Sequence, residues 1–170
     1  MELKNYIRNI PDFPKDGIMF KDITPLLKDK DAFNESIELI KKQYSDIEID
    51  YIVGIEARGF IVGTPLALAM NKGFIPIRKT GKLPSEVVTA SYDLEYGSNE
   101  LELHRDAIDE GDKILIVDDL LATGGTVKAA CDLIEELDGD IVSVAFLLEL
   151  EELNGRDKLK EYDVFSLLKD

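Results

Sequence analysis

The sequence predicts a single α/β domain built on a doubly wound, mainly parallel sheet with flanking helices. Three strongly apolar runs rich in β-branched residues, at 50–55, 113–117 and 141–148, are typical of strands that are covered on both faces. Helical patterns at 59–70 and 125–137 separate these runs. The alternation of strand and helix favours right-handed crossovers between parallel strands.

Length and composition limit the function classes. A chain of 170 residues that is 45% hydrophobic can bury one core but has no room for two ordinary domains, so we expect one domain over residues 1–170. The 20 basic and 35 acidic residues give a net charge of -15, which repels nucleic acid and anionic membranes. Neither is expected as a partner, and any bound phosphate needs a local basic or backbone-amide site.

The composition also bears on location and on hydrolytic chemistry. The N-terminus lacks the apolar run of a signal peptide, and no stretch approaches the roughly 20 apolar residues of a membrane span, so we expect a cytoplasmic protein. The single cysteine, Cys131, rules out an internal disulfide and a thiolate zinc site. The single histidine, His104, lies in a polar, alternating segment without a nucleophile-elbow pattern, which favours a surface histidine.

The N-terminal 30 residues are expected to form a small cap. Helix and strand breakers are frequent there, which predicts an irregular but ordered segment; they are Pro11, Pro14, Gly17 and Pro25. The following stretch, 31–43, has apolar residues at helical spacing, with Asp29 and Asp31 available as N-terminal caps. It predicts an amphipathic helix.

A hairpin arm is expected over residues 87–103. The segments 87–92 and 100–103 have strand character and enclose a polar loop, 93–99, in which Gly97-Ser98-Asn99 marks the turn.

The strongest functional pattern follows the strand predicted at 113–117. Two carboxylates and a loop of small residues lead directly into a helix, in the order Asp118-Asp119-Leu120-Leu121-Ala122-Thr123-Gly124-Gly125-Thr126. Ligands of open α/β sheets bind beyond the carboxyl ends of the strands, where loop amides and the helix dipole are directed. The glycines allow close approach of a phosphate, and the threonine hydroxyls add donors.

The two carboxylates suit the 2′- and 3′-hydroxyls of a ribose. Simple helix capping would explain one of the polar residues but not two acids, two threonines and two glycines within nine positions. No Walker A sequence and no GxGxxG after a strand is present. The pattern therefore predicts a site for a phosphorylated ribose.

The segment VDDLLATGGT, 117–126, resembles the phosphoribosyl pyrophosphate motif of the type I phosphoribosyltransferases. The resemblance implies the fold of that family and transfer of a phosphoribosyl group. Family members that act on hypoxanthine and guanine usually carry Asp before the Thr-Gly pair, where this chain has Ala122. The resemblance therefore points to the adenine branch of the family.

Other segments resemble the same branch. The stretch 11–27 is similar to the family's base-binding cap, in which Phe20 would stack on adenine and the backbones of Met19 and Lys21 would bind the edge of the base. The family usually has Arg at the position of Lys21, a departure of little weight because the contact is made by the main chain. Leu150 would contact the other face of the base.

Two basic segments are predicted to hold the pyrophosphate. Glu56-Ala57-Arg58 resembles the family's pyrophosphate loop, and its place at a predicted helix N-terminus supports that function independently. Arg78, Lys79 and Lys82 bring three cations within five residues of an acidic chain. The alternative is that these three residues are an ordinary solvated surface segment. The binding role is favoured because a bound diphosphate requires cations from the protein. The resemblance implies that part of this cluster reaches across a homodimer interface.

The arm sequence SYDLEYG, 91–97, resembles the family's mobile catalytic loop. By that resemblance, Glu95 and Tyr96 would close over the site, exclude water and place a carboxylate near the imidazole nitrogens of adenine.

The implied reaction is a step of purine salvage, in which N9 of adenine attacks the ribose of phosphoribosyl pyrophosphate to give AMP and pyrophosphate. Mg²⁺, held mainly by substrate oxygens and water rather than by protein ligands, would help the cations to neutralise the leaving group. The predicted catalytic residues are Arg58, Glu95, Asp118 and Asp119. Two alternatives stay open: an enzyme for another base, such as xanthine or orotate, and a non-catalytic regulator that senses phosphoribosyl pyrophosphate.

Overall fold

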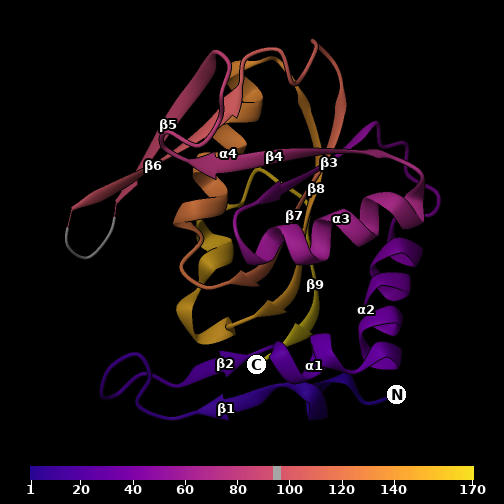
Figure 1. Ribbon diagram of the computed structural model, residues 1–170, viewed down its shortest axis with the longest axis vertical. Helices are drawn as coiled ribbons and strands as arrows, with labels where there is room; N and C mark the ends of the chain where they lie inside the picture. Colours follow the sequence, from indigo (N-terminus) through magenta and orange to yellow (C-terminus); the bar gives the residue numbers. More distant parts are fainter. Residues whose placement is uncertain (94–96) are drawn as a thin grey trace.

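A computed structural model describes residues 1–93 and 97–170 (Figure 1). Its centre is a seven-stranded mixed sheet, whose strands in spatial order are β5 (Val87–Asp93), β6 (Ser98–His104), β4 (Gly73–Lys79), β3 (Tyr51–Ile55), β7 (Lys113–Leu121), β8 (Asp140–Glu149) and β9 (Val164–Lys169). The five strands from β4 to β9 run parallel, and β5 and β6 add an antiparallel edge. The predicted doubly wound, mainly parallel architecture is confirmed.

Helices cover both faces of this sheet. Leu115 and Val117 of β7 pack in one core cluster with α2 (Lys30–Gln43) and α3 (Arg58–Met70). Ile114 and Ile116 point to the opposite face and pack with α4 (Gly125–Glu136). This two-sided burial explains why the parallel strands are continuously apolar in sequence. None of the helices within 1–93 and 97–170 is long and apolar enough to cross a membrane.

The predicted helices are close to those observed. The helix expected at 31–43 is α2, and the side chain of Asp29 caps it by accepting hydrogen bonds from the amides of Asp31 and Ala32, at 3.1 and 2.9 Å.

The N-terminal cap differs from the prediction of an irregular segment. It contains a 3₁₀ turn, η1 (Leu3–Tyr6), an antiparallel pair of strands, β1 (Arg8–Ile10) and β2 (Phe20–Asp22), and a short helix, α1 (Thr24–Lys28). The breakers do not prevent this, because Pro11, Pro14 and Gly17 lie between the two strands. Pro25 lies in the first turn of α1, where its missing N–H is not needed. The cap packs near β9 and the C-terminus, at the bottom of Figure 1.

The hairpin arm is confirmed, but its turn is shorter than the predicted 93–99. Asp93 pairs with Ser98 and Tyr92 with Asn99, so both ends of the predicted loop belong to the strands. The arm joins the sheet through β6, which pairs with the end of β4.

Candidate active site

The carboxyl end of β7 projects beyond its neighbour β3. The last pair between the two strands joins Gly54 to Val117, and β7 then continues to Leu121 beside β8. The prediction that the strand stops at 117 is therefore wrong: Asp118 and Asp119 lie within the strand. Because β3 has already ended, they still flank open space at the carboxyl edge of the sheet.

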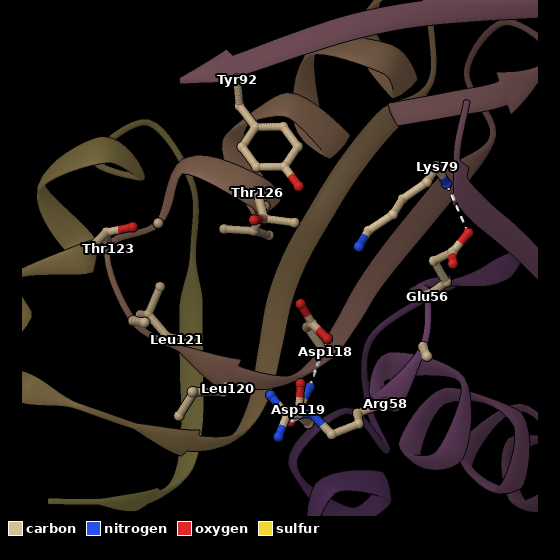
Figure 2. A pocket seen from close by; sticks show the side chains of 14 residues that line it. Glu56, Arg58, Lys79, Tyr92, Asp118, Asp119, Leu120, Leu121, Thr123 and Thr126 are labelled. Carbon is tan, nitrogen blue, oxygen red and sulfur yellow. Dashed lines mark hydrogen bonds and ion pairs between the residues drawn. The ribbon is translucent and has the colours of Figure 1, made fainter. Parts of the chain in front are cut away.

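A cavity of about 350 Å³ occupies that space (Figure 2). Its wall is formed by the turn after β3 with the start of α3, the end of β7 with the following loop and the first turn of α4, and one residue each from β4 and β5. The lining residues are Glu56, Ala57, Arg58, Lys79, Tyr92, Asp118, Asp119, Leu120, Leu121, Ala122, Thr123, Gly124, Thr126 and Val127. The structure thus brings together the segments predicted to bind ribose, phosphate and pyrophosphate.

The two carboxylates of β7 differ in their surroundings. Asp119 is only 6% exposed, and its Oδ2 pairs with Nε of Arg58 at 2.9 Å, as Figure 2 shows. Oδ1 of Asp118 accepts a hydrogen bond of 2.9 Å from the backbone amide of Asp119. Burial and the neighbouring charge of Asp119 together raise the pKa of Asp118 well above its usual range. The two carboxylates therefore have one ion pair between them, the one that Arg58 forms with Asp119.

Glu56 has the opposite environment. Its side chain is 7% exposed and accepts from Nζ of Lys82 at 2.7 Å, from Nε of Arg78 at 3.3 Å and from the amide of Lys79 at 2.7 Å. Burial alone would raise the pKa of Glu56, but the hydrogen bonds from Lys82 and the Lys79 amide, with the charges of Lys82 and Arg78, lower it overall. Glu56 thus holds Arg78, Lys79 and Lys82, the predicted cationic cluster, beside the cavity.

Lys79 and the turn after β3 complete this side of the cavity. The amide of Lys79 binds Glu56, while its ammonium extends into the cavity in Figure 2. The peptide bond between Glu56 and Ala57 is cis. Arg78 and Lys82 do not line the cavity themselves.

The phosphate-loop prediction is supported by the backbone. Gly124 has φ of +88° and immediately precedes α4, so the conformation requires glycine. A Cβ at Gly124 would lie 2.6 Å from the carbonyl oxygen of Gly155. Gly125, predicted as part of the loop, is the first residue of α4 and is not among the residues that line the cavity.

The residues predicted to bind the base lie next to the loop but around a second cavity. Met19, Lys21 and Leu150 line a space of about 410 Å³ together with three acidic residues, Glu151, Glu152 and Asp170. The amide of Leu150 donates to the carbonyl of Leu121 at 3.0 Å, which attaches this second cavity to the end of β7.

Phe20 connects the cap to the first cavity. The guanidinium carbon of Arg58 lies 5.7 Å from the centroid of the Phe20 ring, a cation–π contact, and Phe13 packs edge-on against the same ring at 5.1 Å. The structure therefore places Phe20 beside Arg58 rather than exposing it. Lys21 forms an ion pair with Asp170, and its ammonium also donates to Asn9 at 2.9 Å.

Sequence reasoning missed some of the lining residues. Val127 lies outside every predicted site segment; Tyr92, Leu120 and Leu121 lie in the predicted arm and loop but were not assigned individual binding roles. Tyr92 could have been found from the period of two along β5, which places it on the same face as the buried Val88. Glu95 and Tyr96 lie outside the described residues.

The described ranges contain no group of three or more His, Cys, Asp or Glu side chains arranged to hold a metal ion. Asp119 is already paired with Arg58, so Asp118 is the carboxylate of this pair that remains available to a cation.

Comparison with known proteins identifies relatives that match the whole chain. The model of the phosphoribosyl transferase domain family matches residues 23–170. The chain is 72% identical to adenine phosphoribosyltransferase of Halothermothrix orenii over 100% of both chains, and 54% identical to that of Thermosipho africanus over 99% of both.

Solved structures agree with these matches. The crystal structure of adenine phosphoribosyltransferase from Thermoanaerobacter pseudethanolicus has a TM-score of 0.96 at 54% identity, covering 99% of this chain and 98% of that one. The Saccharomyces cerevisiae enzyme, solved with adenine and an imino-altritol bisphosphate, has a TM-score of 0.93 at 42% identity, covering 98% of this chain and 96% of that one.

Proposed function

The chain belongs to the phosphoribosyl transferase domain family, and on that premise we propose that it transfers the 5-phosphoribosyl group of phosphoribosyl pyrophosphate to adenine, giving AMP and pyrophosphate. The reaction is a pentosyl transfer of purine salvage. The observation that carries the proposal is the first cavity, where a carboxylate pair, a phosphate loop and a cationic cluster meet at one edge of the sheet.

Asp118 and Asp119 are proposed to bind the ribose hydroxyls and to favour the positive charge that develops at C1. Attack by N9 of adenine inverts C1 while the bond to pyrophosphate breaks, through an oxocarbenium-like transition state. The raised pKa of Asp118 supports this assignment, because a crowded carboxylate pair is stabilised when positive charge approaches it. Thr123, Gly124, Gly125 and Thr126, with the backbone of Ala122, would hold the 5′-phosphate.

The leaving pyrophosphate is proposed to lie between Arg58 and the cluster held by Glu56. Arg58 lines the cavity at the N-terminus of α3, and the ammonium of Lys79 enters the cavity from β4. Arg78 and Lys82 stay close through their ion pairs with Glu56. Ala57 contributes backbone to this side of the cavity. These residues supply the cations that a multiply charged leaving group needs.

Adenine is proposed to bind between the cap and Leu150. The backbones of Met19 and Lys21 would hydrogen-bond its edge, and Phe20 would stack on one face. The second cavity, which Met19, Lys21 and Leu150 share, supports this place for the base. Glu95 and Tyr96 are proposed to close over the bound substrates.

Mg²⁺ is proposed as the cofactor, held mainly by substrate oxygens and water. The residues fit that arrangement, since oxygen ligands suit Mg²⁺ and Asp118, unlike Asp119, forms no ion pair within the described ranges. The ion would supply charge neutralisation to the pyrophosphate.

We also propose a cytoplasmic homodimer of single-domain chains. The outward face of α3 is apolar: Leu68 is 82% exposed and Ile61 39%, and a second copy of the chain would cover such a stripe. Cys131 is free and buried, as is usual in a reducing compartment.

The deciding experiment incubates the purified protein with phosphoribosyl pyrophosphate and Mg²⁺ and, separately, adenine, hypoxanthine, guanine, xanthine or orotate. Adenine is expected to give nucleotide at least about a hundredfold faster than the other bases, a ratio that polar contacts to the base edge can supply. Turnover with another base alone would replace adenine in the proposal. Binding of phosphoribosyl pyrophosphate with no turnover of any base would instead support a sensing regulator.

A further inference from the structure

The segment that follows β8 packs against the outside of the phosphate loop. It consists of two 3₁₀ turns, η2 (Glu151–Leu153) and η3 (Gly155–Lys158). A Cβ at Gly155 would lie 2.5 Å from the carbonyl oxygen of Ala122, and the Gly155 carbonyl occupies the space beside Gly124. No side chain fits between the two segments, so η3 forms the outer wall of the loop.

Side-chain contacts fix this wall to the sheet. Arg156 pairs with Glu149 at the end of β8 through two hydrogen bonds, of 2.7 and 2.9 Å, and Glu149 is buried. Arg156 also donates to the carbonyl of Val164 in β9 at 3.1 Å. Leu159, directly after η3, is buried in the core. The backbone of Lys158 is therefore held between two anchored residues.

The ammonium of Lys158 lies beside the first residue of α4. A Cβ at Gly125 would be 3.7 Å from Nζ of Lys158. In the part of the chain that the structure describes, Lys158 makes no ion pair and no side-chain hydrogen bond, and it is exposed. It is not among the residues that line the first cavity, and its ammonium lies beside Gly125, which directly follows the cavity-lining residues Thr123 and Gly124.

Among the other cations near the site, the ammonium of Lys79 enters the cavity from β4 and forms no ion pair within the described ranges, whereas three others have carboxylate partners. Arg58 is paired with Asp119 and Lys82 with Glu56, both at the opposite side of the cavity. Lys128, one turn into α4, is paired with Asp132 at 2.5 Å. The first turn of α4 carries no acidic residue that would compete for the Lys158 ammonium.

We propose that Lys158 is a further binding residue for the 5′-phosphate, to which its ammonium donates a charge-assisted hydrogen bond from the rim of the loop. This inference rests on the proposed function, which supplies a ligand with a 5′-phosphate. Backbone amides bring no net charge to a phosphate of about two negative charges, whereas an ammonium on a flexible four-carbon stem does.

The test compares ligands with and without the phosphate. Calorimetry with Lys158→Gln is expected to show about a tenfold higher Kd for AMP, the size of one charge-assisted hydrogen bond, with the Kd for adenosine unchanged. Pyrophosphate should bind as tightly as to the parent protein, because it lies at the other side of the cavity. Lys158→Arg should restore most of the AMP affinity.

Lys160→Gln is the matched control, since Lys160 is also exposed and lies two positions further along the chain. It should leave both Kd values unchanged. In turnover, Lys158→Gln should raise KM for phosphoribosyl pyrophosphate about tenfold and change kcat less than about twofold.

An unchanged AMP Kd in a folded Lys158→Gln, an equal loss of adenosine binding, or the same loss in Lys160→Gln would each overturn the assignment. These binding measurements do not depend on turnover. The proposed function fails separately, if the parent protein makes no AMP from adenine.

Discussion

The two sides of the first cavity use the same chemical group in opposite ways. At the end of β3, Glu56 is surrounded by three donors from the segment 78–82, and its pKa is lowered. Within the projecting part of β7, Asp118 lies beside a second carboxylate, and its pKa is raised. Burial raises the pKa of both groups and is the largest cause at Asp118, where the charge of Asp119 adds to it; at Glu56 the hydrogen bonds and charges of the cationic segment 78–82 outweigh burial.

This contrast assigns different tasks to the two sides. Glu56 already has its hydrogen-bond and ion-pair partners without a ligand, and under the proposed function it would hold cations in place for an anionic leaving group. Arg58 is the cation paired with the carboxylates of β7, and under the same proposal that pair would gain stability when a ribose develops positive charge. The proposed substrate, which becomes negative at one end and positive at its centre, would suit both sides of the cavity.

Removal of a charge on the β7 side is expected to have the largest effect. Asp119→Asn should lower kcat/KM for phosphoribosyl pyrophosphate by about a hundredfold to a thousandfold, the size of a lost electrostatic contact to a transition state. It should keep the fold, because an amide of the same size remains in place. Steady-state kinetics and circular dichroism measure the two quantities.

Asp132→Asn makes the same chemical change on the surface of α4, where Asp132 pairs with Lys128. It should leave kcat/KM within about twofold of the parent, as exposed ion pairs contribute little. Unchanged turnover in Asp119→Asn would contradict the ribose-binding role.

Loss of a cation on the β3 side should have an intermediate effect. Lys79→Ala removes the ammonium that enters the cavity but keeps the amide that binds Glu56, and kcat/KM is expected to fall about tenfold to a hundredfold. The control, Lys72→Ala, removes an exposed ammonium before β4 and should have no effect. A loss of the same size in both variants would mean that net charge, rather than position, matters.

The smallest effects should appear in stability, with opposite dependence on pH. The raised pKa of Asp118 destabilises the folded state most strongly above that pKa; the cost shrinks as the pH falls below it and is gone below the ordinary pKa of an aspartate. Asp118→Asn should therefore increase the free energy of unfolding at pH 8 by about 1 kcal/mol, which corresponds to a rise in Tm of about 3 °C. This gain should shrink in acid.

The lowered pKa of Glu56 stabilises the folded state above its ordinary value, and that stabilisation is lost as the pH falls through the lowered pKa. Glu56→Gln should lower Tm at pH 7 by only about 1–2 °C, because Lys82 and Arg78 are partly exposed and solvent screens them. Thermal melts from pH 3 to pH 8 measure both variants. Two parallel pH profiles would refute the electrostatic contrast.

The features predicted from sequence are those encoded locally. The loop 118–126 could be predicted because its carboxylates, threonines and glycines are consecutive. The parallel strands at the centre of the sheet were recognisable because burial on both faces leaves a continuous apolar run. β4 was missed since Gly73 and Pro76 interrupt its pattern, although β3 and β6 hold it in the sheet.

The contacts that could not be predicted join distant segments. Nothing local indicates that Glu56 would bind Lys82, or that Phe20 would lie beside Arg58. The end of β7 was placed too early because two adjacent acids resemble the start of a loop; pairing with β8 keeps them in the strand. Lys158 lies on a 3₁₀ turn without a recognisable pattern, and only packing brings it to α4.

Gly124 and Gly155 limit how the specificity of this protein can be redesigned. The space available to the loop 122–126 is limited by the carbonyl of Gly155, which belongs to a segment far along the chain. Larger residues introduced at 122–126 alone, in a library selected for a bulkier sugar phosphate, would clash with the backbone at Gly155. Libraries for directed evolution should therefore vary 154–158 together with 122–126.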